Sequence, residues 1–157
     1  MQSTRVRLRH VISRVPDFMT PVPLDARLSV SGQIEAADLP ALAGRGVTLV
    51  INNRPDGELP AHLASAQAAA LAADLGVDYR YQPVTFAALS RADVDAFTNA
   101  VAQAPGCVHA HCRSGIRSAS LWALGRILAG EDREAVRQDA LTHGFDIKEA
   151  LAWLDRQ

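Results

Sequence analysis

Two hydrophobic patterns follow one another along the chain and predict alternating strands and helices. Short apolar runs closed by turn residues predict strands at residues 28–31, 47–52, 77–84 and 107–111. Longer segments rich in alanine and leucine predict helices at residues 36–43, 62–75, 90–104, 118–129, 132–142 and about 147–154. Strands separated by helices indicate an α/β protein with a mainly parallel sheet.

Local signals mark the ends of two helices, and the order of the elements indicates at which end of the strands the functional residues lie. Ser90 precedes a helical segment and Asp93 follows three residues later, which is typical of a capping box. Gly76 is a typical stop for the preceding helix. In parallel α/β sheets, chemistry lies at the C-terminal ends of the strands. Residues 53–56 and the loop after residue 111 both fall at such ends.

Length and composition bound the number of domains. The chain has 157 residues, of which 48% are apolar, and this is enough for one core of ordinary size. We expect an N-terminal extension at residues 1–20 and a catalytic domain at residues 21–157. Residues 4–14 carry four arginines and no acidic residue. We interpret them as a frayed tail, with a transit segment or an arm for an acidic partner as alternatives.

Charge, hydropathy and cysteine content limit the kinds of partner, the location and the cofactors that are expected. A formal net charge of −1 disfavours nucleic-acid binding driven by bulk charge. No apolar stretch is long enough to cross a bilayer, and the first residues lack the apolar core of a signal peptide. Cys107 and Cys112 lie too far apart on an extended segment for a disulfide, so reduced thiols and a cytoplasmic location are expected. The sequence indicates no cofactor, and His109, His111 and Cys112 are too few ligands for a metal site.

Residues 107–118, Cys-Val-His-Ala-His-Cys-Arg-Ser-Gly-Ile-Arg-Ser, join an apolar strand to an alanine-rich helix through a compact loop. Backbone N–H groups of such a loop, with the positive end of the helix, can surround an oxyanion and stabilise a thiolate. Cys112 is therefore the candidate nucleophile, with a buried structural thiol as the alternative. Arg117 offers a planar fork to two oxygens of a phosphate, sulfate or thiosulfonate, unless it faces solvent.

The neighbours of Cys112 are candidates for supporting and binding roles. His111 is expected to orient the loop and tune the thiolate, or to be a half-buried histidine at a strand end. Ser118 is expected to hydrogen-bond the Cys112 sulfur, which is compatible with a place at the helix start. Cys107 is expected to fill apolar space rather than act as a resolving thiol. The candidate substrate-binding set comprises Arg54, Arg113, Ser114, Gly115, Ile116 and Ser118, with Arg113 also able to face solvent.

The spacing of this loop relates the chain to two groups of enzymes. His-Cys-x-x-Gly followed by Arg-Ser resembles the signature of cysteine-dependent protein phosphatases, in which the arginine clamps the phosphoryl oxygens. Those enzymes place five residues between cysteine and arginine, whereas four separate Cys112 from Arg117. Many rhodanese-type sulfurtransferases also have the sequence Cys-Arg-Ser-Gly-x-Arg-Ser in their active loop. The loop alone is therefore compatible with both chemistries.

Two further motifs extend the resemblance over roughly residues 20–150. Leu-Ser-Val-Ser-Gly-Gln at residues 28–33 and Val-Ile-Asn-Asn-Arg-Pro-Asp-Gly-Glu at residues 50–58 precede the loop. In this order they resemble the beta-lactamase hydrolase-like phosphatase family. The resemblance implies a single-domain, tyrosine/dual-specificity-phosphatase-like three-layer sandwich with a shortened loop. It also implies a family of poorly defined physiological substrate, sometimes labelled sulfurtransferase.

The general acid is the missing part of the resemblance. Tyrosine-phosphatase-like enzymes usually carry an aspartate on the loop after the strand that corresponds to residues 77–84. Residues 83–90 contain no carboxylate. Asp56 and Glu58 of the Arg-Pro-Asp-Gly-Glu turn are the substitutes, and Asp56 is the preferred acid. Its alternative role is that of a turn residue favoured by Pro55 and Gly57.

Together these features predict a cysteine-dependent, phosphatase-like hydrolase of phosphoric monoesters. The Cys112 thiolate is expected to form a phosphocysteine, with Arg117 and loop amides holding oxygens and Asp56 as acid and base. One alternative is a rhodanese-like sulfurtransferase that uses a Cys112 persulfide. Another is a non-catalytic oxyanion or phosphoprotein binding module. Expected partners are a phosphorylated or sulfur-bearing small molecule or a phosphoprotein, without nucleic acid or membrane.

Overall fold

The structure, a computed structural model, describes residues 20–58 and 62–157. Strands and helices alternate from β2 to α4, as the hydrophobic pattern predicts. The strands are β1 (Val22–Pro23), β2 (Leu28–Ser31), β3 (Val47–Asn52), β4 (Asp78–Tyr81) and β5 (Cys107–His111). The helices are α1 (Asp38–Gly44), α2 (Ser65–Asp74), α3 (Arg91–Gln103), α4 (Ile116–Leu128), α5 (Arg133–Thr142) and α6 (Lys148–Asp155).

A five-stranded sheet in the order β1-β2-β5-β3-β4 forms the centre of the domain. β2, β5, β3 and β4 run parallel to one another, and the edge strand β1 pairs antiparallel with β2. The last residue of β5, His111, is in register with Ser31 of β2 and Asn52 of β3. The loops that follow these three strands therefore leave the same edge of the sheet, side by side.

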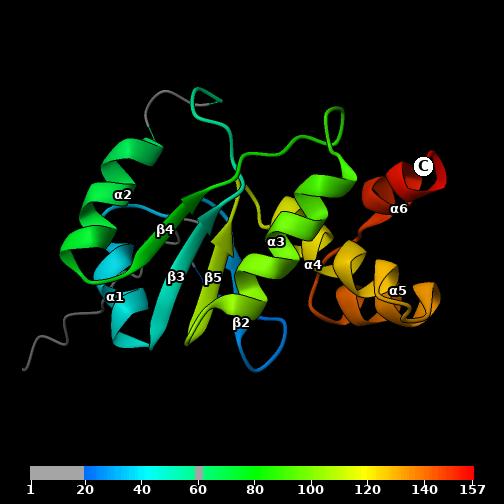
Figure 1. Ribbon diagram of the computed structural model, residues 1–157, viewed down its shortest axis with the longest axis horizontal. Coiled ribbons are helices and arrows are strands. Elements are labelled where there is room, and N and C mark those ends of the chain that lie inside the picture. Colours follow the sequence, from blue (N-terminus) through cyan, green and yellow to red (C-terminus); the bar gives the residue numbers. More distant parts are fainter. Residues whose placement is uncertain (1–19, 59–61) are drawn as a thin grey trace, which may run out of the picture.

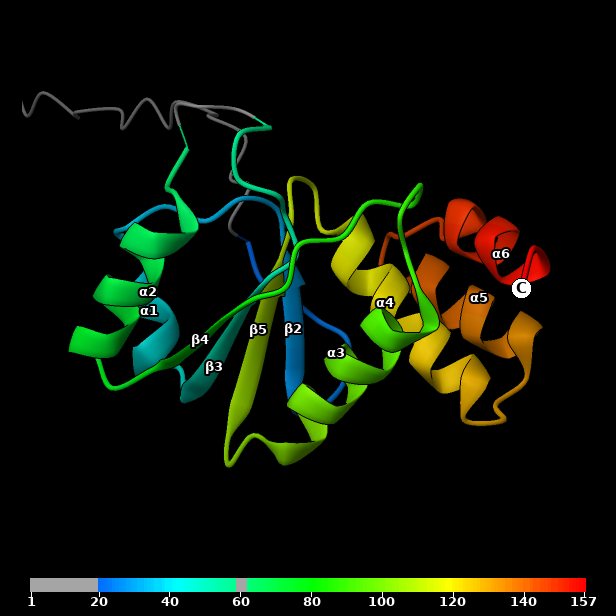
Figure 2. The ribbon, with the colours of Figure 1, turned by 45° about the horizontal axis from the view of Figure 1, so that its top comes forward.

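Helices cover both faces of the sheet and make a three-layer sandwich. α1 and α2 lie on one side, while α3, α4, α5 and α6 lie on the other (Figure 1, and turned in Figure 2). Val47 and Val50 of β3 belong to the smaller core under α1 and α2, whereas Leu49 and Ile51 belong to the larger core. A register shift between residues 47 and 49 explains why the strand does not alternate regularly.

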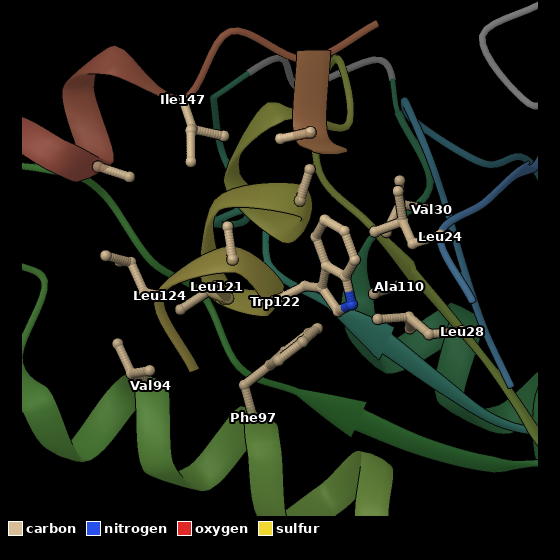
Figure 3. Packing of buried hydrophobic residues seen from close by; sticks show 14 of the residues in the cluster. Leu24, Leu28, Val30, Val94, Phe97, Ala110, Leu121, Trp122, Leu124 and Ile147 are labelled. Carbon is tan, nitrogen blue, oxygen red and sulfur yellow. The ribbon is translucent and has the colours of Figure 1, made fainter. Parts of the chain in front are cut away.

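The larger core surrounds α4, the helix that follows the Cys112 loop. Trp122 of α4 lies between Phe97 of α3 and Leu28 of β2 in Figure 3, with Leu121 and Leu124 projecting from other sides of the helix. Each residue from 118 to 124 is buried. A helix buried on all sides is held firmly by its neighbours, so the core fixes the position of the loop that precedes it.

Most element boundaries agree with the sequence pattern, and the differences are local. The strands at residues 28–31, 47–52 and 107–111 are confirmed, as is the capping box of Ser90 and Asp93. The strand expected at 77–84 is shorter and ends at Tyr81, although the N–H groups of Gln82 and Val84 still donate to carbonyls at the end of β3. α2 begins later than expected, α4 begins earlier, and β1 was not expected.

The expected N-terminal extension lies, up to residue 19, outside the described residues. Within residues 20–58 and 62–157, no helix combines the length and apolar character needed to span a membrane.

Candidate active site

Cys112 lies at the start of a tight loop between β5 and α4. Its side chain is fully buried, and its sulfur accepts a hydrogen bond from the backbone N–H of Gly115 at 3.1 Å. Gly115 is the N-cap of α4, so the sulfur lies at the positive end of that helix. The sulfur therefore shares the end of the helix with backbone N–H groups that can also bind an oxyanion.

The loop requires glycine at position 115. Gly115 has a φ of +93°, in the left-handed region that L side chains rarely adopt. A Cβ atom there would also lie 3.1 Å from Phe145 Cε1 and 3.4 Å from the backbone carbon of Ser31. Phe145 and β2 thus pack directly against the loop, and they leave no room for a side chain at this turn.

Arg117 lies in the first turn of α4, and its guanidinium reaches the loop that follows β4. Nη1 donates to the Val84 carbonyl at 3.1 Å. Nη2 donates to Glu58 Oε2 at 3.1 Å and lies 2.8 Å from Glu58 Oε1. The Arg117 side chain is only 12% exposed, so it does not face solvent, which was the alternative expected for this residue.

Glu58 also faces a second, more deeply buried arginine. Its Oε1 atom lies 3.8 Å from Arg54 Nε. Arg54 is 4% exposed, and its Nη1 donates to Gln33 Oε1 at 2.7 Å. One carboxylate therefore lies between the guanidinium groups of Arg54 and Arg117, and the cluster of three side chains carries a net positive charge.

Asp56, the expected acid, contacts the first residue of α2. Its Oδ1 accepts the backbone N–H of Ser65 at 3.0 Å, and its Oδ2 accepts the Ser65 hydroxyl. Ala64, the N-cap of α2, has no side-chain acceptor, so Asp56 caps this helix from the preceding turn. α2 covers the face opposite to α4 (Figure 1). Both carboxylate oxygens are therefore engaged by Ser65 at the start of α2, and the role of Asp56 as the acid stays a prediction.

Ser118 also has a different partner from the one expected. Its buried hydroxyl donates to Asn53 Oδ1 at 2.8 Å rather than to the Cys112 sulfur. Asn53 in turn donates its backbone N–H to the His111 carbonyl at 2.8 Å and its side-chain amide to the Gln82 carbonyl at 3.0 Å. This network joins the start of α4 to the ends of β3, β4 and β5, so Ser118 helps to hold the start of α4, and with it the Cys112 loop, against the sheet.

His111 contacts the backbone of the nucleophile and not its sulfur. Its Nδ1 lies 3.5 Å from the Cys112 carbonyl oxygen. Burial lowers the pKa of His111 to about 4; the hydrogen bond to Cys112 opposes this shift, and the charge of Arg54 adds to it. At neutral pH His111 is therefore an uncharged support of the loop.

A second buried histidine, His109, lies between two serines of β2. Its Nδ1 is 2.8 Å from Ser29 Oγ and its Nε2 is 2.8 Å from Ser31 Oγ. Ser31 Oγ donates to the Gly32 carbonyl, so it accepts the Nε2–H, and Nδ1 accepts from Ser29. Burial, followed by the proximity of His111, lowers the pKa of His109 to about 3. The neutral ring thus fixes the end of β2 beside the loop.

The remaining loop residues contribute in different ways. Arg113 is exposed, and its carbonyl accepts the Gln33 N–H at 3.2 Å. Ser114 is exposed at the mouth of the loop, whereas Ile116 packs against the larger core. The structure thus brings Cys112 and Gly115 into contact and places the other expected residues of the loop around them. Arg54 lies close through its contacts with Gln33 and Glu58.

Sequence reasoning missed two supporting residues, Gln33 and Asn53. Each directly follows the end of a buried strand or its first turn, at the edge where functional residues are expected. A search for polar residues at that edge would have found both. Their partners could not be found in this way, because the hydrogen bonds join segments that are distant in sequence.

Solved structures of known proteins show the same architecture. A candidate phosphatase from Neisseria meningitidis matches with a TM-score of 0.76 and 29% identity, over 87% of this chain and 97% of that one. A candidate phosphatase from Shewanella putrefaciens matches with a TM-score of 0.68 and 25% identity, over 87% and 89% of the two chains. TpbA of P. aeruginosa, solved in complex with phosphotyrosine, has a TM-score of 0.63 at 20% identity, covers 89% and 90%, and shares the fold alone. The domain has a tyrosine/dual-specificity-phosphatase-like fold.

Sequence comparison gives the particular family. Residues 19–129 match the family described as "Beta-lactamase hydrolase-like protein, phosphatase-like domain", so the chain belongs to this family. A beta-lactamase hydrolase-like protein of Agrobacterium fabrum is 39% identical over 140 residues, or 88% of this chain. One from Xylella fastidiosa is 37% identical over the same length. The chain spans 32% of the length of each of these relatives.

Proposed function

We propose that this domain is a cysteine-dependent phosphatase that hydrolyses phosphoric monoesters at Cys112. The observation that carries the proposal is the hydrogen bond from the Gly115 N–H to the buried Cys112 sulfur at the start of α4. The same N-terminal helix turn that holds the sulfur suits a phosphoryl group, so a bound phosphate would lie next to the nucleophile. Membership of a phosphatase-like family supports this choice.

The proposed reaction proceeds in two displacements at phosphorus. The Cys112 thiolate attacks phosphorus, the bond to the ester oxygen breaks, and the leaving oxygen takes a proton from solvent. Loop N–H groups and the Arg117 guanidinium stabilise the charge on the phosphoryl oxygens. Water then attacks the phosphocysteine and loses a proton to solvent. The sulfur–phosphorus bond breaks, inorganic phosphate leaves, and the thiolate is restored.

The choice of substrate follows from the carboxylates near the loop. Asp56 is hydrogen-bonded to Ser65, and Glu58 is paired with Arg117, so the proposal assigns neither carboxylate as the acid that protonates the leaving group. General acid catalysis typically contributes about 10²- to 10⁴-fold. We therefore expect aryl phosphates, whose leaving groups depart without a proton, to react at least about 10²-fold faster than alkyl phosphates.

A paired assay tests the proposed function. Purified protein is given nitrophenyl phosphate in one arm and thiosulfate with cyanide in the other. We expect phosphate release that is lost in Cys112→Ser and kept in Cys107→Ser, the matched control at the far end of β5. Thiocyanate formation without phosphate release would instead identify a sulfurtransferase. Inactivity in both arms with retained phosphate binding would identify a binding module.

A further inference from the structure

A small cavity lies beside the Cys112 loop, at the C-terminal end of β3. It has a volume of about 70 Å³, and Arg54, Gln33, His62 and Ala64 contribute to its lining. Gln33 also donates its backbone N–H to Arg113, so the cavity adjoins the loop without being part of it. A water molecule occupies about 30 Å³ in the liquid, so the space suits a group as small as a carboxylate or a phosphate.

Arg54, which lines this cavity, has buried hydrogen-bond donors that lack partners. The residue is 4% exposed, and only its Nη1 is paired, with Gln33 Oε1. Across the described part of the chain, Nε and Nη2 find no hydrogen-bond partner, and Glu58 Oε1 lies 3.8 Å from Nε. Unpaired donors of a buried guanidinium are costly. An arginine kept in this state is better explained by a ligand than by stability.

The cavity is also prepared for a negative charge. Gln33 is fixed by a hydrogen bond from its Nε2 to the Ile34 carbonyl at 2.8 Å, which leaves its Oε1 to orient Arg54. Ala64 is the N-cap of the ten-residue helix α2, whose positive end lies at the cavity. Asp56 borders the same space, but both of its oxygens accept hydrogen bonds from Ser65.

We propose that this cavity is a second oxyanion subsite, in which Arg54 binds a phosphate or carboxylate group of the substrate beside the phosphoryl group held at Cys112. The proposal rests on the proposed function for the position of the first anion. Arg54 Nε and Arg117 Nη2 both lie near Glu58 Oε1, at 3.8 and 2.8 Å. The two anionic groups are therefore separated by only a few bonds. The substrate class is a small phosphomonoester that carries a second anion.

Ligand binding to Cys112→Ser protein, which cannot turn substrate over, tests the subsite by calorimetry. The probes are methylphosphonate with one anionic group, phosphonoacetate with an added carboxylate, and methylenebisphosphonate with an added phosphonate. We expect at least one of the two bis-anions to bind about tenfold or more tightly than methylphosphonate, and the better one identifies the second group. Arg54→Gln should abolish this advantage and leave methylphosphonate affinity within about twofold. Arg91→Gln, a change of equal charge at an exposed side chain of α3, should keep the advantage.

Stability separates a ligand-binding arginine from a structural one. Because Arg54→Gln removes a buried charge with unpaired donors, we expect its melting temperature to equal or exceed that of the parent. A bis-anion advantage that is missing in the parent, or that survives in Arg54→Gln, would overturn the subsite. So would a large fall in melting temperature with unchanged affinities.

A separate readout distinguishes failure of the subsite from failure of the proposed function. Titration with inorganic phosphate is followed through the side-chain amide of Gln33 and the backbone amide of Gly115 by nuclear magnetic resonance. A Gln33 response that is lost in Arg54→Gln supports the subsite even if Gly115 and turnover fail to respond. A Gly115 response without one at Gln33 keeps the Cys112 loop and removes the subsite.

Discussion

The Glu58 carboxylate holds the Arg117 guanidinium through both of its oxygens, which lie 2.8 and 3.1 Å from Nη2. Together with the hydrogen bond from Nη1 to the Val84 carbonyl, this contact fixes the planar fork of the arginine at the start of α4. Misplacement of a binding group by about 1 Å can cost a factor of 10² in rate, so the carboxylate acts as a positioning residue. We expect Glu58→Gln to lower kcat/KM for nitrophenyl phosphate by about tenfold or more.

A double-mutant cycle checks whether Glu58 acts through Arg117. Arg117→Lys should cost on the order of 10²- to 10³-fold, as loss of an oxyanion-stabilising group does. In that background Glu58→Gln should add little, because its partner is already absent. Fully multiplicative effects of the two changes would show that Glu58 has an independent role, such as proton transfer.

Replacement of Asp56 should affect stability and not the chemistry of the leaving group. Asp56→Ala removes the acceptor that caps α2, which typically costs about 1 kcal/mol of unfolding free energy. Urea unfolding measures this loss, and Ser65→Ala, which removes one partner of the same contact, is the matched control. The ratio of aryl to alkyl phosphate turnover should not change. A selective loss of alkyl phosphate turnover would restore Asp56 as the acid.

The Ser118 hydroxyl is expected to contribute to folding more than to departure of the thiolate. Ser118→Ala leaves the buried Asn53 Oδ1 without its donor, at a cost of about 1–3 kcal/mol. Chemical unfolding of Ser118→Ala and of Ser118→Thr, which keeps a hydroxyl, gives the size of the effect. Single-turnover kinetics should show an unchanged rate of phosphocysteine hydrolysis. A slower hydrolysis step in a variant of normal stability would return Ser118 to the sulfur.

The fold could be predicted well, and the details of the site only in part, for physical reasons. Residues 47–52 and 107–111 are buried on both faces, so their apolar runs give a strong local signal. Parallel pairing of β3 with β5 then brings the C-terminal ends of the two strands together. The proximity of residues 53–58 to the Cys112 loop follows from this pairing.

The direction of each carboxylate could not be read from the sequence. Asp56 and Glu58 belong to one turn and are two residues apart, yet Asp56 binds the start of α2 and Glu58 binds Arg117. The outcome depends on the capping need at Ala64 and on an arginine almost sixty residues later. A sequence pattern reports residue types and spacing, whereas these contacts depend on how the turn is oriented between two helices.

The buried histidines of β5 should make the fold sensitive to acid. Burial lowers the pKa of His109 from 6.5 to about 3 and that of His111 from 6.5 to about 4. As pH falls below 6.5, the unfolded chain binds protons that the folded chain does not, so stability is lost towards pH 3 to 4. Each histidine contributes at most about 1.4 kcal/mol per pH unit.

Urea midpoints measured from pH 7 downward test this sensitivity. His109→Gln should make the unfolding free energy fall less steeply with decreasing pH, because one histidine that resists protonation is removed. At neutral pH the variant should be less stable than the parent, because Ser29 and Ser31 lose a hydrogen-bond partner. An unchanged slope in His109→Gln would show that this ring does not resist protonation.

The proposed mechanism requires Cys112 to carry the phosphoryl group during turnover. Acid quenching within one turnover of an aryl phosphate, followed by peptide mass spectrometry, measures this intermediate directly. We predict one added phosphoryl group on the peptide of Cys112, none on the peptide of Cys107, and accumulation that disappears in Cys112→Ser. Phosphate release at the parent rate in Cys112→Ser, or a phosphoryl group found on another residue, would contradict the assignment of the nucleophile.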